Sequence, residues 1–196
     1  MQININFREV PPKRLWLQGS GFWTHRFEIS VRPVSIAEFR KFCKSTNYIT
    51  TAEDVEQGSS YLSSPSLDPS VQDSPENTPV TYVSHVDAQA FCAWADVCLP
   101  TDLEWLLASV RCWEPIMSED CYWTKVANLD PGELEWHVFA GGPEWIESDV
   151  NGQAIVRVAP RIFRKEDAAE DSYPLPSLSY SDAISFRVVN RRFRKR

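Results

Sequence analysis

Cysteine and histidine, the side chains most often used for metal binding and nucleophilic catalysis, are thinly spread along this chain of 196 residues. Its five cysteines are Cys43, Cys92, Cys98, Cys112 and Cys121. Its three histidines are His25, His85 and His137. No two cysteines stand at Cys-x-x-Cys spacing, so the sequence predicts no zinc site of the usual kind. We expect buried free thiols, with one disulfide as the alternative. Cys98 and Cys112 lie near predicted helix ends, where a thiol can be exposed.

The charge balance argues against a nucleic-acid-binding body. The chain carries 20 basic and 27 acidic side chains, for a formal net charge of -7. Five of the basic groups fall within residues 191–196, so the rest of the chain is more acidic still. An acidic body does not attract phosphate backbones. We expect residues 191–196 to be a solvated basic tail, with contact to nucleic acid or an acidic surface as the alternative.

The composition is that of a globular chain with a core of its own. Apolar residues make up 43% and aromatic residues 12%, including 8 Trp, and this length usually forms one domain. No run approaches eighteen apolar residues, so we expect no membrane-spanning segment. The first residues lack the apolar core of a secretory signal, which predicts a cytoplasmic protein.

Alternating apolar residues predict strands in the first thirty residues and in two later stretches, AIVRVAP and DAISFRVVN, which we expect to pair in one sheet. Three short helices are predicted from capping boxes, in which a hydroxyl and a carboxylate three residues later satisfy the first backbone N–H groups. These boxes are Ser35 with Glu38, Ser84 with Asp87, and Thr101 with Glu104. Residues 57–79 are rich in Ser, Pro and Asp and predict a long surface loop. The tryptophans at 123, 136 and 145 are expected to fill the core from irregular chain.

Four segments together resemble one protein family. They are SVRPVSIAEFRKFCKSTNYITTAE, TPVTYVSHVDAQAFCAWADVCLPTDLEWLLASV, PEWIESD and the closing Ser185-Phe186-Arg187. The second, with its LPTDLEW block, is the most specific. The chain resembles the formylglycine-generating enzyme family, also called the sulfatase-modifying factor domain. This resemblance implies one α+β domain over residues 1–190 with a C-type-lectin-like fold: two or three short helices, small antiparallel sheets and much irregular loop.

The resemblance implies an oxidation reaction, but the residues that carry it out in the family have no match in this sequence. Active members are copper-dependent oxidases that hold the metal with two cysteines before a final Gly-Phe-Arg, since thiolates suit Cu(I). This chain has no cysteine after Cys121, and Ala159-Pro160-Arg161 replaces the family's Gly-Gly-Ser. A second branch, the sulfoxide synthases, adds a histidine-rich iron-binding domain that is not seen here. We therefore expect no cofactor and no formylglycine generation.

Several single residues have two interpretations. His85 stands where the family has Trp; we expect a polar surface residue or cap partner, with a ligand or base as the alternative. Family members hold calcium with oxygen ligands, and Asn128, Leu129 and Glu144 resemble part of such a site. We expect Glu144 to be an ordinary loop carboxylate, with a degenerate calcium site as the alternative. Cys98 replaces a family Arg and is expected to be a buried thiol, with a reactive thiol as the alternative.

The sequence thus predicts a non-catalytic binding or interaction module whose partner is a protein or a small ligand. The variable proteins of diversity-generating retroelements share this scaffold and place their variable face just before a similar C-terminal motif. Tyr and Ser are favoured contact residues. The candidate recognition residues in that region are Tyr173, Ser177, Ser179 and Tyr180. Two alternatives stay open: a divergent oxidoreductase of the family, and a retroelement variable protein, against which Pro174 and Pro176 argue.

Overall fold

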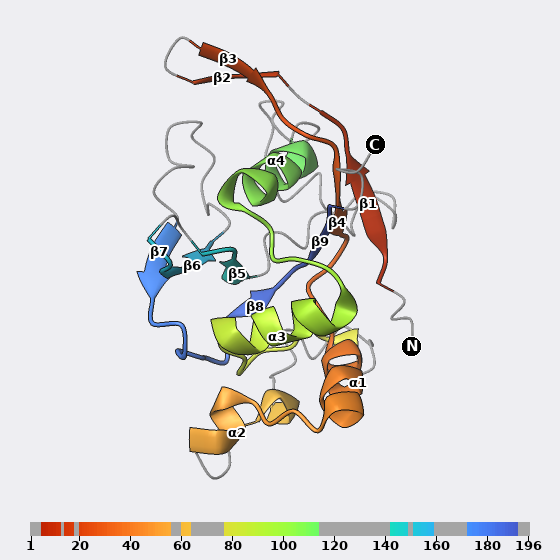
Figure 1. Cartoon of the computed structure of the whole chain (residues 1–196), viewed down its shortest axis with the longest axis vertical. Helices are drawn as coiled ribbons and strands as arrows, with labels where there is room; N and C mark the ends of the chain where they lie inside the picture. Colours follow the sequence, from red (N-terminus) through yellow and green to blue (C-terminus); the bar gives the residue numbers. More distant parts are fainter. Residues whose placement is uncertain are drawn as a thin grey trace, which may run out of the picture.

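The computed structural model describes residues 5–12, 14–17, 20–55, 60–63, 77–113, 142–148, 151–158 and 172–191. A three-stranded antiparallel sheet joins the two ends of this part of the chain. Its strands, in the order β1-β4-β9, are β1 (Phe7–Val10), β4 (Phe27–Ser30) and β9 (Val189–Asn190). Between the first two, β2 (Arg14–Leu17) and β3 (Ser20–Trp23) form a hairpin that extends past the sheet (Figure 1). The strands predicted near the start of the chain are confirmed.

A second, four-stranded sheet has the order β7-β6-β5-β8. Its strands are β5 (Glu144–Ile146), β6 (Ala154–Arg157), β7 (Ser172–Leu175) and β8 (Ser185–Phe186). All its pairs are antiparallel except β5 with β8, which run parallel. The two C-terminal stretches expected to pair do share this sheet, but β5 lies between them, and β9 belongs to the first sheet. Trp145 therefore stands in a strand, where irregular chain was expected.

Four α-helices and a short 3-10 helix are formed by the described residues. They are α1 (Ile36–Thr46), α2 (Thr51–Val55), η1 (Tyr61–Ser63), α3 (His85–Ala95) and α4 (Asp102–Trp113). All three predicted capping boxes are confirmed. Helix α2 was not predicted, although a fourth box begins it: the Thr50 hydroxyl accepts from the backbone N–H of Glu53, whose carboxylate accepts from that of Thr50.

The larger of two core clusters lies where α1 and α3 meet the four-stranded sheet, and the smaller one lies between α4 and the three-stranded sheet. Phe39 of α1 stacks on Phe91 of α3 with ring centroids 5.8 Å apart, and both rings meet Phe186 of β8 edge-on. Tyr61 of η1 also packs on Phe39, at 5.2 Å. The predicted surface loop is thus anchored in the core at η1, while its residues 57–59 and 64–76 lie outside the described ranges.

Figure 1 shows how these elements are arranged. The N-terminal strands run along one side, α4 lies between the hairpin and the centre, and α1, α2 and α3 gather at the opposite end. The segment from β7 to β8 passes close to α3. None of the helices in the described ranges is long and apolar enough to cross a bilayer.

Candidate functional site

The four candidate recognition residues lie on β7 and on the segment that links β7 to β8. Tyr173 lies on β7 opposite Val156 of β6 and is 38% exposed. Ser177 is exposed, and Ser179 and Tyr180 are half-buried. Sequence reasoning missed Leu178, which is 59% exposed between the two serines. The exposed side chains of Tyr173 and Leu178 both give this part of the surface apolar contact area.

Backbone hydrogen bonds hold this segment against the start of α3. The N–H of Val86 donates to the Ser177 carbonyl at 3.3 Å, and the N–H of Tyr82 donates to the Ser181 carbonyl at 2.8 Å. Within the segment, Ser179 N–H donates to the Pro176 carbonyl at 2.9 Å. The loop is therefore fixed at both ends of its exposed part. We call the surface formed by residues 173–181 together with Tyr82 and Val86 the recognition face.

Tyr82 has an unusual backbone conformation beside this loop. Its φ of 55° lies in the left-handed region, which is uncommon for a bulky residue and carries a conformational cost. Asn47 and Asp96 also have positive φ, but they are the C-caps of α1 and α3, where that conformation is ordinary. The hydrogen bond to Ser181 is one contact that holds Tyr82 in place.

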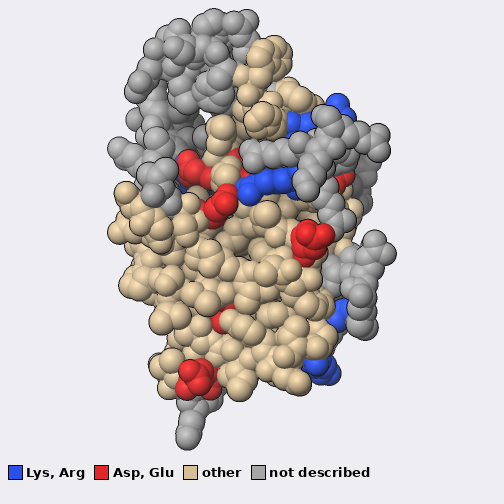
Figure 2. Space-filling model, in the orientation of Figure 1, with Lys and Arg blue, Asp and Glu red and all other residues tan. Residues whose placement is uncertain are grey.

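The recognition face carries little charge. Val86, in the first turn of α3, is 37% exposed and adds to the apolar area. Figure 2 shows a broad surface with few charged side chains where Figure 1 places α3 and the segment between β7 and β8. Such a surface is suited to protein binding, because its aromatic, aliphatic and hydroxyl groups can be buried without an oppositely charged group on the partner.

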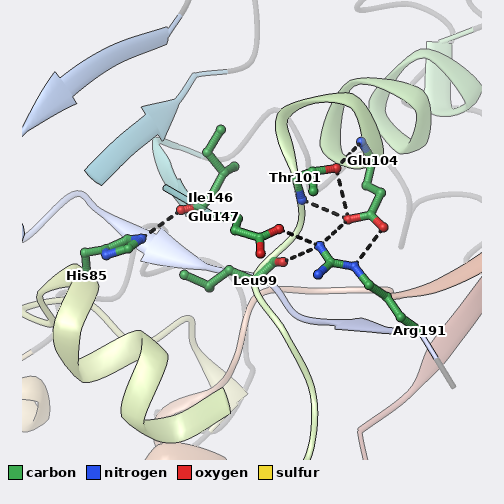
Figure 3. Close-up of polar contacts among 7 residues, drawn as sticks. All are labelled: His85, Leu99, Thr101, Glu104, Ile146, Glu147 and Arg191. Carbon is green, nitrogen blue, oxygen red and sulfur yellow. Dashed lines mark hydrogen bonds and ion pairs between the residues drawn. The ribbon is translucent and has the colours of Figure 1, made fainter. Parts of the chain in front are cut away.

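His85 is buried, so the expectation of a polar surface residue was wrong. The residue is 1% exposed, and its ring meets that of Trp145 at 5.6 Å. Its Nε2 lies 2.9 Å from the carbonyl oxygen of Ile146 (Figure 3). Burial lowers the pKa of His85 and outweighs the opposing effect of that carbonyl. A neutral imidazole that donates to a backbone carbonyl ties α3 to β5 and has no nucleophile as its partner.

Glu104 and Arg191 form an ion pair at the start of α4. Arg191 donates from Nε and Nη2 to both carboxylate oxygens of Glu104, at 2.9 and 2.7 Å, and its Nη2 also reaches Glu147 at 2.8 Å (Figure 3). Burial raises the pKa of Glu104, but hydrogen bonds from Arg191 and Thr101 outweigh it and hold that pKa below its usual value. Arg191 therefore belongs to the fold, which corrects its assignment to a solvated tail; residues 192–196 lie outside the described ranges.

Glu144 is a buried strand residue, which corrects its interpretation as a loop carboxylate. It is 1% exposed on β5 and pairs with Arg187 Nε at 2.9 Å, and Trp105 Nε1 donates to it at 3.1 Å. Those two contacts are made by Oε2, and Arg187 Nε also donates to Oε1 at 3.0 Å. Both oxygens are thus engaged by protein donors, which disfavours calcium binding there. Asn128 and Leu129 lie outside the described ranges, and no group of three metal-ligating side chains occurs among the residues inside them.

The three cysteines that the structure describes are free thiols. Burial raises the pKa of Cys43 to about 12 and also raises that of Cys92, so both are expected to be unreactive. Cys98 is half-buried, more exposed than expected, and its backbone forms a β-bridge with Val189. The Cys112 side chain and all of Cys121 and His137 lie outside the described part of the structure.

Comparison with known proteins relates this chain to one protein family. The profile of the sulfatase-modifying factor enzyme 1-like domain matches residues 8–161. Formylglycine-generating enzymes of Bos taurus and Mus musculus are 31% and 30% identical over 127 and 128 residues, and each match covers 50% of this chain. A hercynine oxygenase of Mycobacterium tuberculosis (strain ATCC 25618 / H37Rv) is 44% identical over 45 residues, 23% of this chain.

These matches cover unequal shares of the relatives. This chain spans 32% of the length of each formylglycine-generating enzyme and 10% of the hercynine oxygenase. The crystal structure of CarF shares the fold, with a TM-score of 0.58, 15% identity, and coverage of 95% of this chain and 98% of that one. Because the domain profile covers more than half of the sequence, the chain belongs to the sulfatase-modifying factor enzyme 1-like domain family.

Proposed function

We propose that this chain is a non-catalytic binding module that uses the recognition face to contact a protein partner. The observation that carries the proposal is the exposure of Tyr173 on β7 and of Leu178 on the segment that follows it, whose backbone is fixed to α3 and Tyr82. A fixed loop loses little conformational freedom on binding, so more of its contact energy becomes affinity. The strained backbone of Tyr82 supports this, because such strain concentrates at functional sites.

The chemical groups of the described scaffold support a non-catalytic role. His85 is engaged with a backbone carbonyl, Glu144 with Arg187, and Glu104 with Arg191. These contacts stabilise the junctions between elements. In addition, the family resemblance implies two copper-binding cysteines in the C-terminal part, and the sequence has none after Cys121. This mismatch with the pattern that the resemblance implies supports a chain that does not oxidise peptide cysteine.

A cytoplasmic location is part of the same proposal. Cys43, Cys92 and Cys98 are free thiols in the structure. Reducing compartments keep thiols in this state, whereas secreted domains tend to pair them. Fractionation of the source cells tests this point: we expect the protein with the cytosolic fraction.

One experiment tests the recognition face directly. The chain is immobilised and used to capture proteins from a lysate of the source organism, beside a Tyr173→Ala/Leu178→Ala variant. The control is Ile49→Ala, since Ile49 is 67% exposed but lies outside the recognition face. We expect a partner that wild type and control retain and that the double variant binds at least about tenfold more weakly, because exposed aromatic and aliphatic anchors dominate such contacts. Equal capture by all three proteins would refute this face as the binding surface.

A second candidate function is a divergent oxygenase, which the short match to hercynine oxygenase favours. Metal analysis of the purified protein separates the two. Stoichiometric iron or copper that survives dialysis would favour the oxygenase, whereas we expect metal far below one equivalent.

A further inference from the structure

The chain bends sharply at Tyr82, on the recognition face. Tyr82 is half-buried, and its φ of 55° lies in the left-handed region. The two residues on each side of it lie in the interior, at most 3% exposed: Val80, Thr81, Val83 and Ser84. A regular extended chain alternates between interior and solvent, so it could not bury all four. The fold therefore needs a bend at this position.

Contacts of the neighbouring residues hold this bend in place. The N–H of Val80 donates to the Val34 carbonyl at 2.9 Å. On the other side, Nε1 of Trp145 donates to the Val83 carbonyl at 3.0 Å. Neither contact uses the side chain of Tyr82. The bend therefore does not require a tyrosine.

The Tyr82 side chain adds little to the part of the fold that the structure describes. Within that part, its ring and hydroxyl have no hydrogen-bond, ion-pair or ring partner. Neither of the two core clusters there has Tyr82 packed against it, whereas the half-buried Tyr48 packs against the larger one. Gly and Asn adopt the left-handed region at lower cost than a bulky residue. The fold thus explains the bend but not the choice of tyrosine.

The recognition face has no charged residue. Residues 173–181, Tyr82 and Val86 include no acidic or basic side chain. A charged group of a partner, buried against this face, would lose its hydration without gaining an opposite charge. The face therefore fits a contact surface that is itself apolar and uncharged. Tyrosine suits such a contact, since it offers a large ring with few rotatable bonds.

We propose that Tyr82 is an anchor residue of the recognition face and that it contacts an apolar, uncharged surface of a protein partner. Its backbone bond to Ser181 places it next to the segment that carries Leu178. The conformational cost of a left-handed tyrosine is then offset by binding, as is usual for strain at functional sites. This inference rests on the proposed function, to which it adds a residue and the chemistry of the partner.

Tyr82→Asn tests the proposal, because it keeps the bend and removes the ring. We expect its midpoint of urea unfolding to equal or exceed that of wild type, since Asn adopts the left-handed region more readily. In the lysate capture, the partner is the protein that wild type retains and Tyr173→Ala/Leu178→Ala loses. We expect Tyr82→Asn to bind that protein about tenfold more weakly. Tyr82→Phe keeps the ring and should bind within about threefold of wild type.

Two controls accompany these variants. Asn47→Gly changes another left-handed residue, which is exposed and lies outside the recognition face, and it should bind as wild type does. Wild type should also capture its partner no more weakly in about 1 M than in about 0.1 M sodium chloride, because salt does not screen a contact without charges.

The outcomes separate this inference from the proposed function. Equal capture by wild type and Tyr173→Ala/Leu178→Ala would refute the proposed function and the anchor with it. If that double variant loses the partner while Tyr82→Asn retains it, only the anchor is refuted. A clearly lower urea midpoint for Tyr82→Asn would also refute the anchor, because the ring would then serve the fold. Capture that weakens about tenfold in the higher salt would refute the uncharged partner surface.

Discussion

His85 places an ionisable group in the interior, where its protonation opposes folding. Its ring lies between α3 and β5, against Trp145, and donates to the Ile146 carbonyl when neutral. The folded state lowers the pKa of His85 below the usual 6.5. The unfolded chain therefore binds a proton first as the pH falls, so the contribution of His85 is full above about pH 6.5 and is lost progressively below it.

We predict that the free energy of unfolding falls between pH 7.5 and 5.5, by at most about 1.4 kcal/mol per pH unit from this residue. Urea titrations at several pH values measure the slope. His85→Gln keeps a donor for Ile146 without titrating and should flatten the slope over this range. His25→Gln, a change at an exposed histidine, should leave it unchanged. An equal slope in His85→Gln and wild type would contradict the burial argument.

The described cysteines should differ in reactivity according to their burial. Cys43 and Cys92 are buried with raised pKa values, whereas Cys98 is half-buried. Thiolate is the reactive form. In native protein treated with iodoacetamide we expect mass spectrometry to find Cys98 modified well before Cys43 and Cys92, and all three modified in denaturant. Faster native labelling of Cys43 than of Cys98 would contradict the structure.

At the scale of elements, the start of α4 is held in two ways. Thr101 and Glu104 form a capping box, and Glu104 also pairs with Arg191 beside the end of β9. The ion pair is largely shielded, since the two side chains are 18% and 14% exposed. Removal of Glu104 therefore takes away a cap and leaves a partly buried arginine without this carboxylate.

We predict that Thr101→Ala lowers the free energy of unfolding by about 1 kcal/mol, the usual value of a cap. Glu104→Ala should cost about 2 kcal/mol, because it removes the cap and also the better shielded of the two carboxylates that Arg191 contacts. Chemical denaturation of both variants, of Arg191→Ala and of the Glu104→Ala/Arg191→Ala double variant gives the coupling energy. Additive effects of the two single changes would show that the ion pair does not contribute.

The local elements were more predictable than their contacts. Ser35, Ser84 and Thr101 mark helix starts because a capping box is a signal within four residues. The same signal at Thr50 and Glu53 was present and overlooked. Arg191 and Glu104, by contrast, are 87 positions apart, and no local pattern links them.

The same limit explains the errors at individual sites. Burial of His85 depends on β5, 61 positions later, and an isolated helix start would leave it in water. The exposure of Leu178 depends on where the segment between β7 and β8 lies against α3. Tertiary packing decides which side chains are buried and which are exposed. The composition of residues 173–181 could therefore suggest a Tyr- and Ser-rich face, but it could not show which of these side chains reach solvent.

At the scale of the whole molecule, the Glu144–Arg187 pair joins the two sheets. Glu144 lies on β5, and Arg187 follows β8 and donates through Nη1 to the Val31 carbonyl, just after β4, at 2.8 Å. Trp105 adds α4 through its bond to Glu144. This buried pair adds to the backbone hydrogen bonds that also join the sheets here, from Ser30 to Val188 and from Val34 to Phe186.

We predict that Arg187→Ala lowers the free energy of unfolding by about 3–5 kcal/mol, because it leaves a buried carboxylate without its cation. Arg187→Met/Glu144→Leu should recover much of that loss, since an apolar pair avoids the buried charge. Thermal and urea unfolding of the two variants measure this. A double variant no more stable than Arg187→Ala would show that the pair itself, and not the uncompensated charge, sets the stability.

The central claim is that this family scaffold serves here for recognition and does not oxidise cysteine. The most direct measurement incubates the purified chain with copper, oxygen and a cysteine-containing peptide, and follows the peptide by mass spectrometry. We predict that no more aldehyde forms in the peptide than in a control reaction without the protein. Formation of formylglycine in the peptide, dependent on this chain, would contradict the account.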